Sequence, residues 1–87
     1  MAERVIHELK LNKRFFSAVA SGRKNFEIRK DDRDYQVGDI LILKEWDDIM
    51  NNFSGRSVKR QITYIYCGCG QYGLARDYVV MALKEVE

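Results

Sequence analysis

The stretch RSVKRQITYIY, residues 56–66, decides the fold class because its side chains alternate. One face carries apolar and aromatic residues, Val58, Ile62, Tyr64 and Tyr66; the other carries polar ones, Lys59, Gln61 and Thr63. A period of two is typical of a β-strand that buries one face. The stretch therefore predicts one long strand, with Ile62, Tyr64 and Tyr66 on its apolar side.

Four other segments also have the composition of strands, which makes strands the dominant element. ILILKEW, 40–46, is apolar on both faces at first and predicts a central strand covered on both sides. VIHELKL, 5–11, alternates, and residues 24–29 and YVVMALKEV, 78–86, complete the set. The predicted class is α+β, mainly β, with about five strands in a small, strongly curved sheet or barrel.

One segment, KRFFSAVASG at 13–22, predicts a short helix after the first strand. Asn12 suits the helix N-cap and Gly22 suits its C-terminal stop. Phe15 and Val19, four residues apart, form an apolar stripe, so the helix should plug one end of the sheet. Residues 47–55 predict a polar loop with an apolar insert.

Size and charge restrict the class of protein. A chain of 87 residues predicts a single domain over 1–87. The formal net charge of +2 is too small for a purely electrostatic nucleic-acid binder. We find no apolar run that could span a bilayer and no signal-peptide core, so we expect a cytoplasmic protein without a membrane partner.

The two cysteines, Cys67 and Cys69, are the only ones in the chain. A structural zinc site would need both of them, the single histidine His7 and a carboxylate, an improbable set. We therefore expect no metal site and no cofactor, and read the cysteines as small residues of a Gly-rich loop.

The stretch SGRKNFEIRKDDRD, 21–34, concentrates charge of both signs on one strand and one turn. Alternation predicts that Lys24 shares a face with Phe26 and Ile28, and that Glu27 and Arg29 share the other. One interpretation is a solvated face with weak ion pairs. The other is a recognition cleft, in which cations neutralise a phosphate and Glu27 accepts from a base or ribose, or orients the cations.

The segment GRKNFEIR, 22–29, fits the G-x-K-x-x-E-x-R signature of the ASCH superfamily. With HELKL before the helix, RKDDRDYQVGDILILKEWD after the signature and YVVMALK near the end, almost the whole chain resembles a small bacterial and phage-associated ASCH subgroup. The resemblance implies a PUA-like β-barrel with a helix beside its mouth. It also implies a cleft beneath that helix for RNA or a nucleotide, into which Lys24, Glu27 and Arg29 project.

A related small ASCH subgroup hydrolyses N4-acetylcytidine-type nucleosides with a proposed Lys, Thr and Glu set. Lys24 matches that lysine, but Glu27 stands at the threonine position, and Thr63 lies on another predicted strand. We therefore expect a non-catalytic RNA- or nucleotide-binding domain. The alternatives are an amidohydrolase on modified pyrimidine nucleosides, carried by Lys24 and Glu27, and a protein-interaction module that uses the 47–55 loop and the aromatics.

Other side chains are candidates with two interpretations each. Lys10 is either solvated or reaches a phosphate near the helix start. Trp46 either stacks on a base or belongs to the core. His7 is either a general base or a hydrogen-bonded residue of the apolar face. Three cations of the long strand either add positive potential to the cleft or form a solvated edge: Arg56, Lys59 and Arg60.

Overall fold

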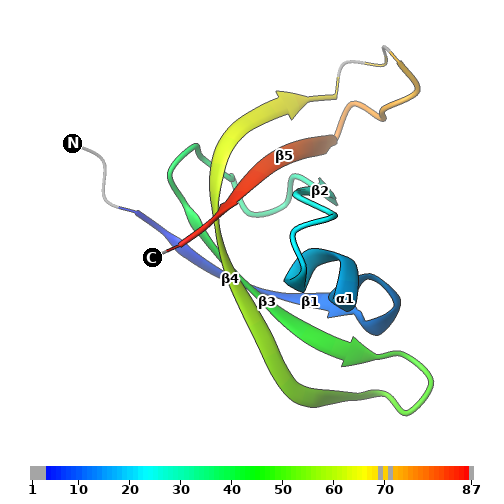
Figure 1. Ribbon diagram of the computed structural model, residues 1–87. Helices are drawn as coiled ribbons and strands as arrows, with labels where there is room; N and C mark the ends of the chain where they lie inside the picture. Colours follow the sequence, from blue (N-terminus) through cyan, green and yellow to red (C-terminus); the bar gives the residue numbers. More distant parts are fainter. Residues whose placement is uncertain (1–3, 69, 71, 87) are drawn as a thin grey trace.

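A computed structural model describes residues 4–68, 70 and 72–86, and within these residues it contains one five-stranded sheet and one short helix (Figure 1). The elements in chain order are β1 (Ile6–Asn12), α1 (Lys13–Ala20), β2 (Phe26–Lys30), β3 (Ile40–Asp47), β4 (Asn52–Cys67) and β5 (Tyr78–Glu85). The order across the sheet is β1-β3-β4-β5-β2, with β1 parallel to β3 and the other pairs antiparallel. The predicted class, mainly β with one helix after the first strand, is confirmed.

The sheet curls because β4 is long and bends between its two partners. Its first part pairs with β3 and its second part with β5. The register with β5 shifts between Ile62 and Tyr64, so Thr63 is an extra residue in β4, which increases bending and twist. The result is a half-barrel whose outer strands, β1 and β2, belong to opposite ends of the strand order (Figure 1).

The same bulge makes one prediction wrong. Tyr64 was expected on the apolar face with Ile62, yet Ile62 is buried and Tyr64 is 66% exposed. Beyond the extra residue it is Ile65 that packs against the core. A one-residue shift moves every later side chain to the opposite face, which alternation in a single sequence does not reveal.

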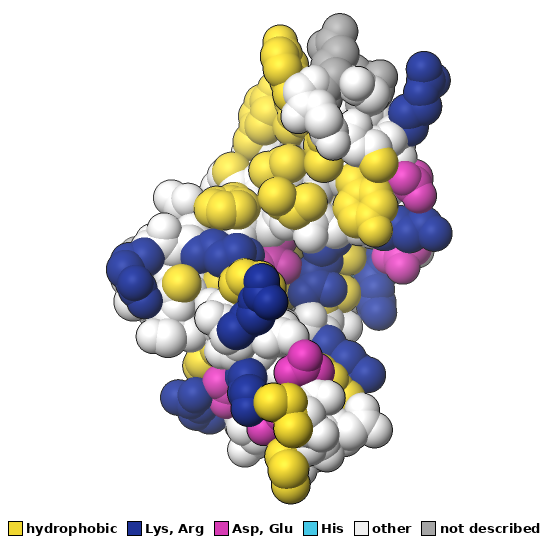
Figure 2. All heavy atoms as spheres, turned by 90° about the vertical axis from the view of Figure 1, so that its right-hand side faces the viewer, with side chains coloured by type: hydrophobic (Ala, Val, Ile, Leu, Met, Phe, Trp, Pro, Cys, Tyr) yellow, Lys and Arg dark blue, Asp and Glu magenta, His cyan; other side chains and the backbone are white. Residues whose placement is uncertain are grey.

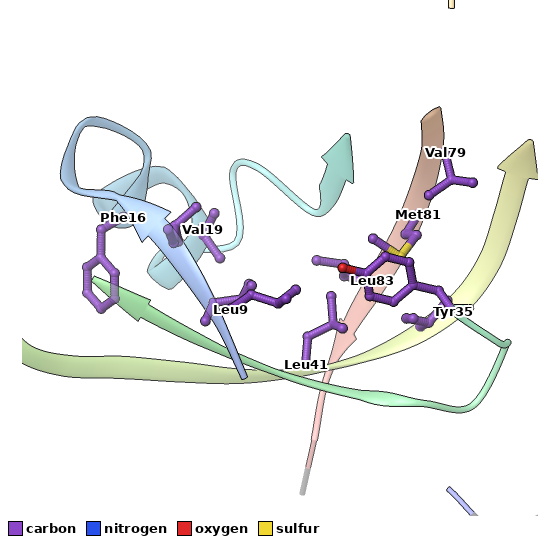
Figure 3. Close-up of a cluster of buried hydrophobic side chains, with 11 residues drawn as sticks. Leu9, Phe16, Val19, Tyr35, Leu41, Val79, Met81 and Leu83 are labelled. Carbon is purple, nitrogen blue, oxygen red and sulfur yellow. The ribbon is translucent and has the colours of Figure 1, made fainter. Parts of the chain in front are cut away.

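The core fills the concave side of the sheet (Figure 3). Leu9 of β1, Leu41 of β3 and Met81 of β5 meet there with Val19 of α1. Ile62 of β4 also belongs to this cluster, so β1, α1, β3, β4 and β5 all contribute, and the core holds the curled sheet and the helix together. Phe15, the other half of the predicted helix stripe, is instead partly exposed at the surface.

Both helix boundaries have the predicted residues. Asn12 is the N-cap, and its Oδ1 accepts a hydrogen bond of 3.0 Å from the Arg14 N–H. At the other end, Gly22 has φ +83°, a left-handed conformation that glycine adopts without a steric cost. The helix therefore ends where the charged stretch begins.

The region around β3 differs from its prediction in two ways. β3 is an interior strand, as predicted. Ile42 is only half-buried, however, so only one face of β3 is fully covered by other side chains. The predicted 47–55 loop is mostly strand, because Asp47 pairs with Asn52 and only the turn between them is irregular. Over the described ranges, no helix has the length and apolarity needed to cross a membrane.

Candidate functional site

A cleft of about 870 Å³ lies between the two outer strands, β1 and β2. Phe15 of α1 and Phe53 of β4 add aromatic walls, and Tyr35 contributes a buried ring. Figure 2 shows cationic and acidic side chains gathered across the middle of one face of the molecule, below a large apolar area. The curvature of the sheet thus produces a hollow between strands that are far apart in the strand order.

Glu27 is the centre of the charged group in this cleft. Its side chain is 4% exposed, and its two carboxylate oxygens accept hydrogen bonds from different cations. The Lys24 ammonium lies 2.7 Å from Oε1, and the Arg29 Nε lies 2.8 Å from Oε2. A buried carboxylate is stable only when it is paired and hydrogen-bonded, so the two cations satisfy it. The three signature residues therefore meet, as the cleft interpretation predicts.

Lys24 reaches this group by a route that alternation did not predict. It was expected on the face of Phe26 and Ile28, but it lies before β2, and its N–H donates to the Ala18 carbonyl at 2.9 Å. Its side chain turns back so that Nζ also donates to the Phe26 carbonyl at 3.0 Å. The ammonium lies 5.4 Å from the Phe15 ring centre and 4.9 Å from the Phe26 ring centre, within cation–π range.

Arg29 connects the two sides of the cleft. While its Nε bonds Glu27 within β2, its Nη2 donates to the main-chain carbonyl of Lys10 in β1. The planar guanidinium fork suits two acceptors in different directions. A single side chain thus bridges the two outer strands of the half-barrel.

Lys10 and Trp46 have different positions relative to the cleft. Lys10 lines it, with its ammonium 3.9 Å from the centre of the Trp46 ring. Trp46 is not among the lining residues and packs edge-on against Phe53 at 4.8 Å. The structure therefore places Lys10 in the same cleft as Lys24, Glu27 and Arg29, whereas Trp46 is not part of the lining.

Sequence reasoning missed several lining residues. Arg33 and Lys44 line the cleft, as do the rings of Phe15 and Phe26. Arg33 lies inside the charged stretch, so its position was a usable signal, whereas Lys44 enters only because β3 pairs with β1. The lining cations are Lys10, Lys24, Arg29, Lys30, Arg33 and Lys44, and the lining acids are Glu8, Glu27 and Asp32. The cleft therefore has an excess of positive charge.

Comparison with known proteins gives a family. A family model described as "Domain of unknown function (DUF3850)" matches residues 6–83. The chain belongs to the DUF3850 family. The matched range includes all of β1 to β4 and most of β5, so the whole cleft lies inside the family's domain.

The chain is also similar to a curated phage protein. The "Uncharacterized 12.9 kDa protein in GpA 3'region" of Escherichia phage P2 is 48% identical over 58 residues, which are 67% of this chain and 51% of the relative. The DUF3850 chain thus spans about half the length of that relative.

His7 lies outside the cleft of this DUF3850 domain. It is buried, its Nε2 is 2.8 Å from Asp39 Oδ2, and its ring packs edge-on against Tyr35. Asp39 also accepts from the N–H groups of Gln36 and Val5. Burial alone would raise the pKa of Asp39, but these hydrogen bonds outweigh it and hold the pKa below its usual value. The arrangement joins β1 to the turn before β3 and is structural.

Two cations of β4, Arg56 and Arg60, bond other parts of the protein and do not line the cleft. Arg56 forms a two-point bond with Glu45 at 3.0 and 2.7 Å, which holds the pKa of that carboxyl below its usual range. Arg60 Nη2 donates to the Val19 carbonyl at 2.9 Å, at the end of α1. Neither these two nor Lys59 lines the cleft of this DUF3850 domain, so they do not supply its positive charge.

The pair considered for hydrolysis, Lys24 and Glu27, meets in the cleft at 2.7 Å, whereas Thr63 and His7 do not line it. Within the described part of the chain, no three His, Cys, Asp or Glu side chains form a metal-type cluster; Cys69 lies outside it. Thr63 does not line the cleft of the DUF3850 domain, and its hydroxyl donates to the Ala82 carbonyl at 3.3 Å.

Proposed function

We propose that this DUF3850 domain binds RNA or a nucleotide in the cleft between β1 and β2. Lys24, Glu27 and Arg29 form the charged part of the site, as the resemblance to ASCH domains implies, and Lys10, which also lines the cleft, adds to it. The observation that carries the proposal is the convergence of Lys24 and Arg29 on buried Glu27 inside an 870 Å³ cleft. Three charged side chains on a solvated strand face would not share a hollow.

The chemistry of the lining supports a nucleic-acid ligand. Positive charge in excess favours phosphate groups and gives binding that weakens with salt. Aromatic rings at the surface of a cleft suit bases, because every base has a face on which a ring can stack. Phe15, Phe26 and Phe53 are all partly exposed and all line this cleft. The site thus combines the two kinds of contact that a nucleotide uses.

The bonding of the group favours binding over hydrolysis. Lys24 is held as a hydrogen-bond donor by two acceptors, Glu27 and the Phe26 carbonyl. Both Glu27 oxygens are paired with cations, which favours a role in fixing those cations over a role as a general base. The arrangement supports a site that holds an anion next to fixed cations.

The test is fluorescence anisotropy with labelled single-stranded RNAs and with nucleotides, at low and increasing salt. We expect the wild-type domain to bind RNA, and Lys24→Ala to weaken binding about tenfold, because Glu27 loses one of its two cations and holds Arg29 less firmly in place. Lys59→Ala is the matched control, because Lys59 is exposed and outside the cleft. Thermal melts confirm that each variant is folded. Absence of RNA and nucleotide binding by the wild-type domain at low salt would overturn the proposal.

A further inference from the structure

The cations of the cleft fall into two groups, those with a partner in the described part of the chain and those without one there. Lys30 pairs with Asp77 at 3.9 Å and Lys44 pairs with Glu8 at 3.2 Å. Lys24 Nζ donates to Glu27 and to the Phe26 carbonyl. Arg29 donates to Glu27 and to the Lys10 carbonyl. The signature cations therefore use their donors on the protein itself, and Glu27 offsets part of their charge. A phosphate would have to compete with bonds that are already formed.

Arg33 and Lys10 form the other group. Both are exposed and line the cleft, and among the described residues neither side chain has a hydrogen-bond or ion-pair partner. The Lys10 ammonium rests over the Trp46 ring, a contact that leaves its N–H donors free. Lys10 belongs to β1 and Arg33 to the segment that follows β2, so the two reach the same cleft from different parts of the chain. They are the cations that can take a phosphate without breaking a bond.

The geometry of the outer strands gives Arg29 a different task. The bond between the Leu83 N–H and the Asn25 carbonyl sets the alternation of the β2–β5 ladder. By that alternation the main chain of Phe26 and Ile28 points away from β5, towards the cleft. Likewise the bond from the Ile40 N–H to the Val5 carbonyl turns the main chain of Lys10 away from β3. Arg29 therefore joins two strand edges that have no backbone ladder between them, and sets the width of the cleft.

We propose that Arg33 and Lys10 contact the phosphates of a single-stranded RNA, while Lys24, Glu27 and Arg29 are positioning residues that brace β2 against β1. This inference rests on the proposed function. Two separate cations in one cleft, neither with a partner in the described ranges, suit a ligand with more than one phosphate, as a strand of RNA has along its backbone. Unpaired bases of such a strand reach the rings of Phe15 and Phe26, which a base inside a duplex does not.

The experiment measures how binding of a short labelled single-stranded RNA varies with salt, because that slope counts neutralised phosphates. Each lost contact lowers the slope of log K against log salt by about 0.7 for a single strand. We expect this decrease, with an unchanged melting temperature, for Arg33→Gln and for Lys10→Gln. Arg76→Gln is the matched control, since Arg76 is exposed and outside the cleft.

The brace is tested with the double variant Glu27→Gln and Arg29→Gln, which keeps the net charge. We expect a lower melting temperature and weaker RNA binding, with a wild-type slope. A slope lowered by about 0.7 in this variant would show that Arg29 contacts phosphate. If Arg33→Gln and Lys10→Gln also matched Arg76→Gln, the assignment would be overturned while the proposed function stood. These two exposed substitutions keep the test decisive even where the double variant does not fold.

Two competition arms complete the test. We expect the unlabelled single strand to displace the label at far lower concentration than a mononucleotide or an RNA duplex of the same sequence. Equal competition by the mononucleotide overturns the single-strand assignment in favour of a nucleotide site. If the wild-type domain binds neither RNA nor nucleotide, the proposed function is overturned instead, so the two failures are distinct.

Discussion

Glu27 and Asp39 are two carboxylates with the same exposure, 3%, and different surroundings. Asp39 is bonded by buried His7 and by the main-chain N–H groups of Gln36 and Val5. Glu27 is bonded by Lys24 and Arg29, both of which line the cleft. Burial alone therefore does not distinguish a carboxylate that only joins parts of the fold from one that lies in the cleft. The hydrogen-bond donors of the carboxylate do distinguish them.

The difference has a physical reason. Backbone N–H groups and a buried imidazole have fixed positions, so Asp39 fastens one part of the chain to another. The two cations at Glu27 have long side chains that are 19% and 22% exposed, so one carboxylate fixes two charges that still face the cleft. For the proposed RNA ligand, charged side chains that are already held in place would cost less entropy to order on binding.

The largest effect on stability is expected at Asp39. Asp39→Ala leaves His7 buried without its acceptor, and it leaves the N–H groups of Gln36 and Val5 unpaired. Removing one member of a buried hydrogen-bonded group costs several times a single net hydrogen bond, so we expect a loss of about 3 kcal/mol in the free energy of unfolding. Urea denaturation followed by circular dichroism measures it.

RNA binding by the same variant sharpens the comparison. Below the denaturation range, folded Asp39→Ala should bind RNA as the wild type does, because Asp39 does not line the cleft. A loss of less than about 1 kcal/mol would show that water replaces the carboxylate and that Asp39 does not fasten the fold.

A smaller effect on stability is expected at Glu27. Glu27→Gln keeps the shape and one acceptor oxygen but turns an amide N–H₂ towards a cation. We expect a loss of about 1–2 kcal/mol in the free energy of unfolding, because Lys24 and Arg29 are partly exposed and water can satisfy them. The same urea titration measures it, and RNA anisotropy should show weaker binding. A variant as unstable as Asp39→Ala would mean that Glu27 serves the fold in the same way.

Much of the fold was predictable because local signals agree with tertiary structure. Alternation located the strands, and Asn12 and Gly22 located both ends of the helix. The face of Tyr64 was not predictable, since the bulge at Thr63 depends on how β4 pairs with β5. The start of β4 at Asn52 was missed because polar residues of a hairpin resemble a loop.

The site was predictable only in part, for a related reason. Lys24, Glu27 and Arg29 are close in sequence, so the contacts among them depend only on β2 and on the residues just before it. Arg33 and Lys10 line the same cleft only because the curled sheet brings β2 and β1 to its two edges. The partner of Asp39 was hidden for the same reason, since His7 is 32 residues away and meets it through the parallel pairing of β1 with β3.

The smallest expected effect is the pH dependence that Asp39 contributes. Its folded pKa is lowered from 3.8, so the unfolded chain binds a proton more readily than the folded chain does. Asp39 therefore adds stability above about pH 4 and loses it as the pH falls through the lower, folded pKa. The effect is small because burial of the carboxylate opposes the hydrogen bonds that lower its pKa.

We expect the free energy of unfolding to fall less steeply between about pH 4 and pH 2 in Asp39→Asn than in the wild type, by urea titration at each pH. Glu45→Gln is the comparison variant, because Arg56 lowers the pKa of Glu45 by a separate contact. If Asp39→Asn kept the wild-type acid slope while Glu45→Gln reduced it, the acid sensitivity would belong to the Glu45–Arg56 pair, and Asp39 would stabilise the fold through hydrogen bonds that protonation does not weaken.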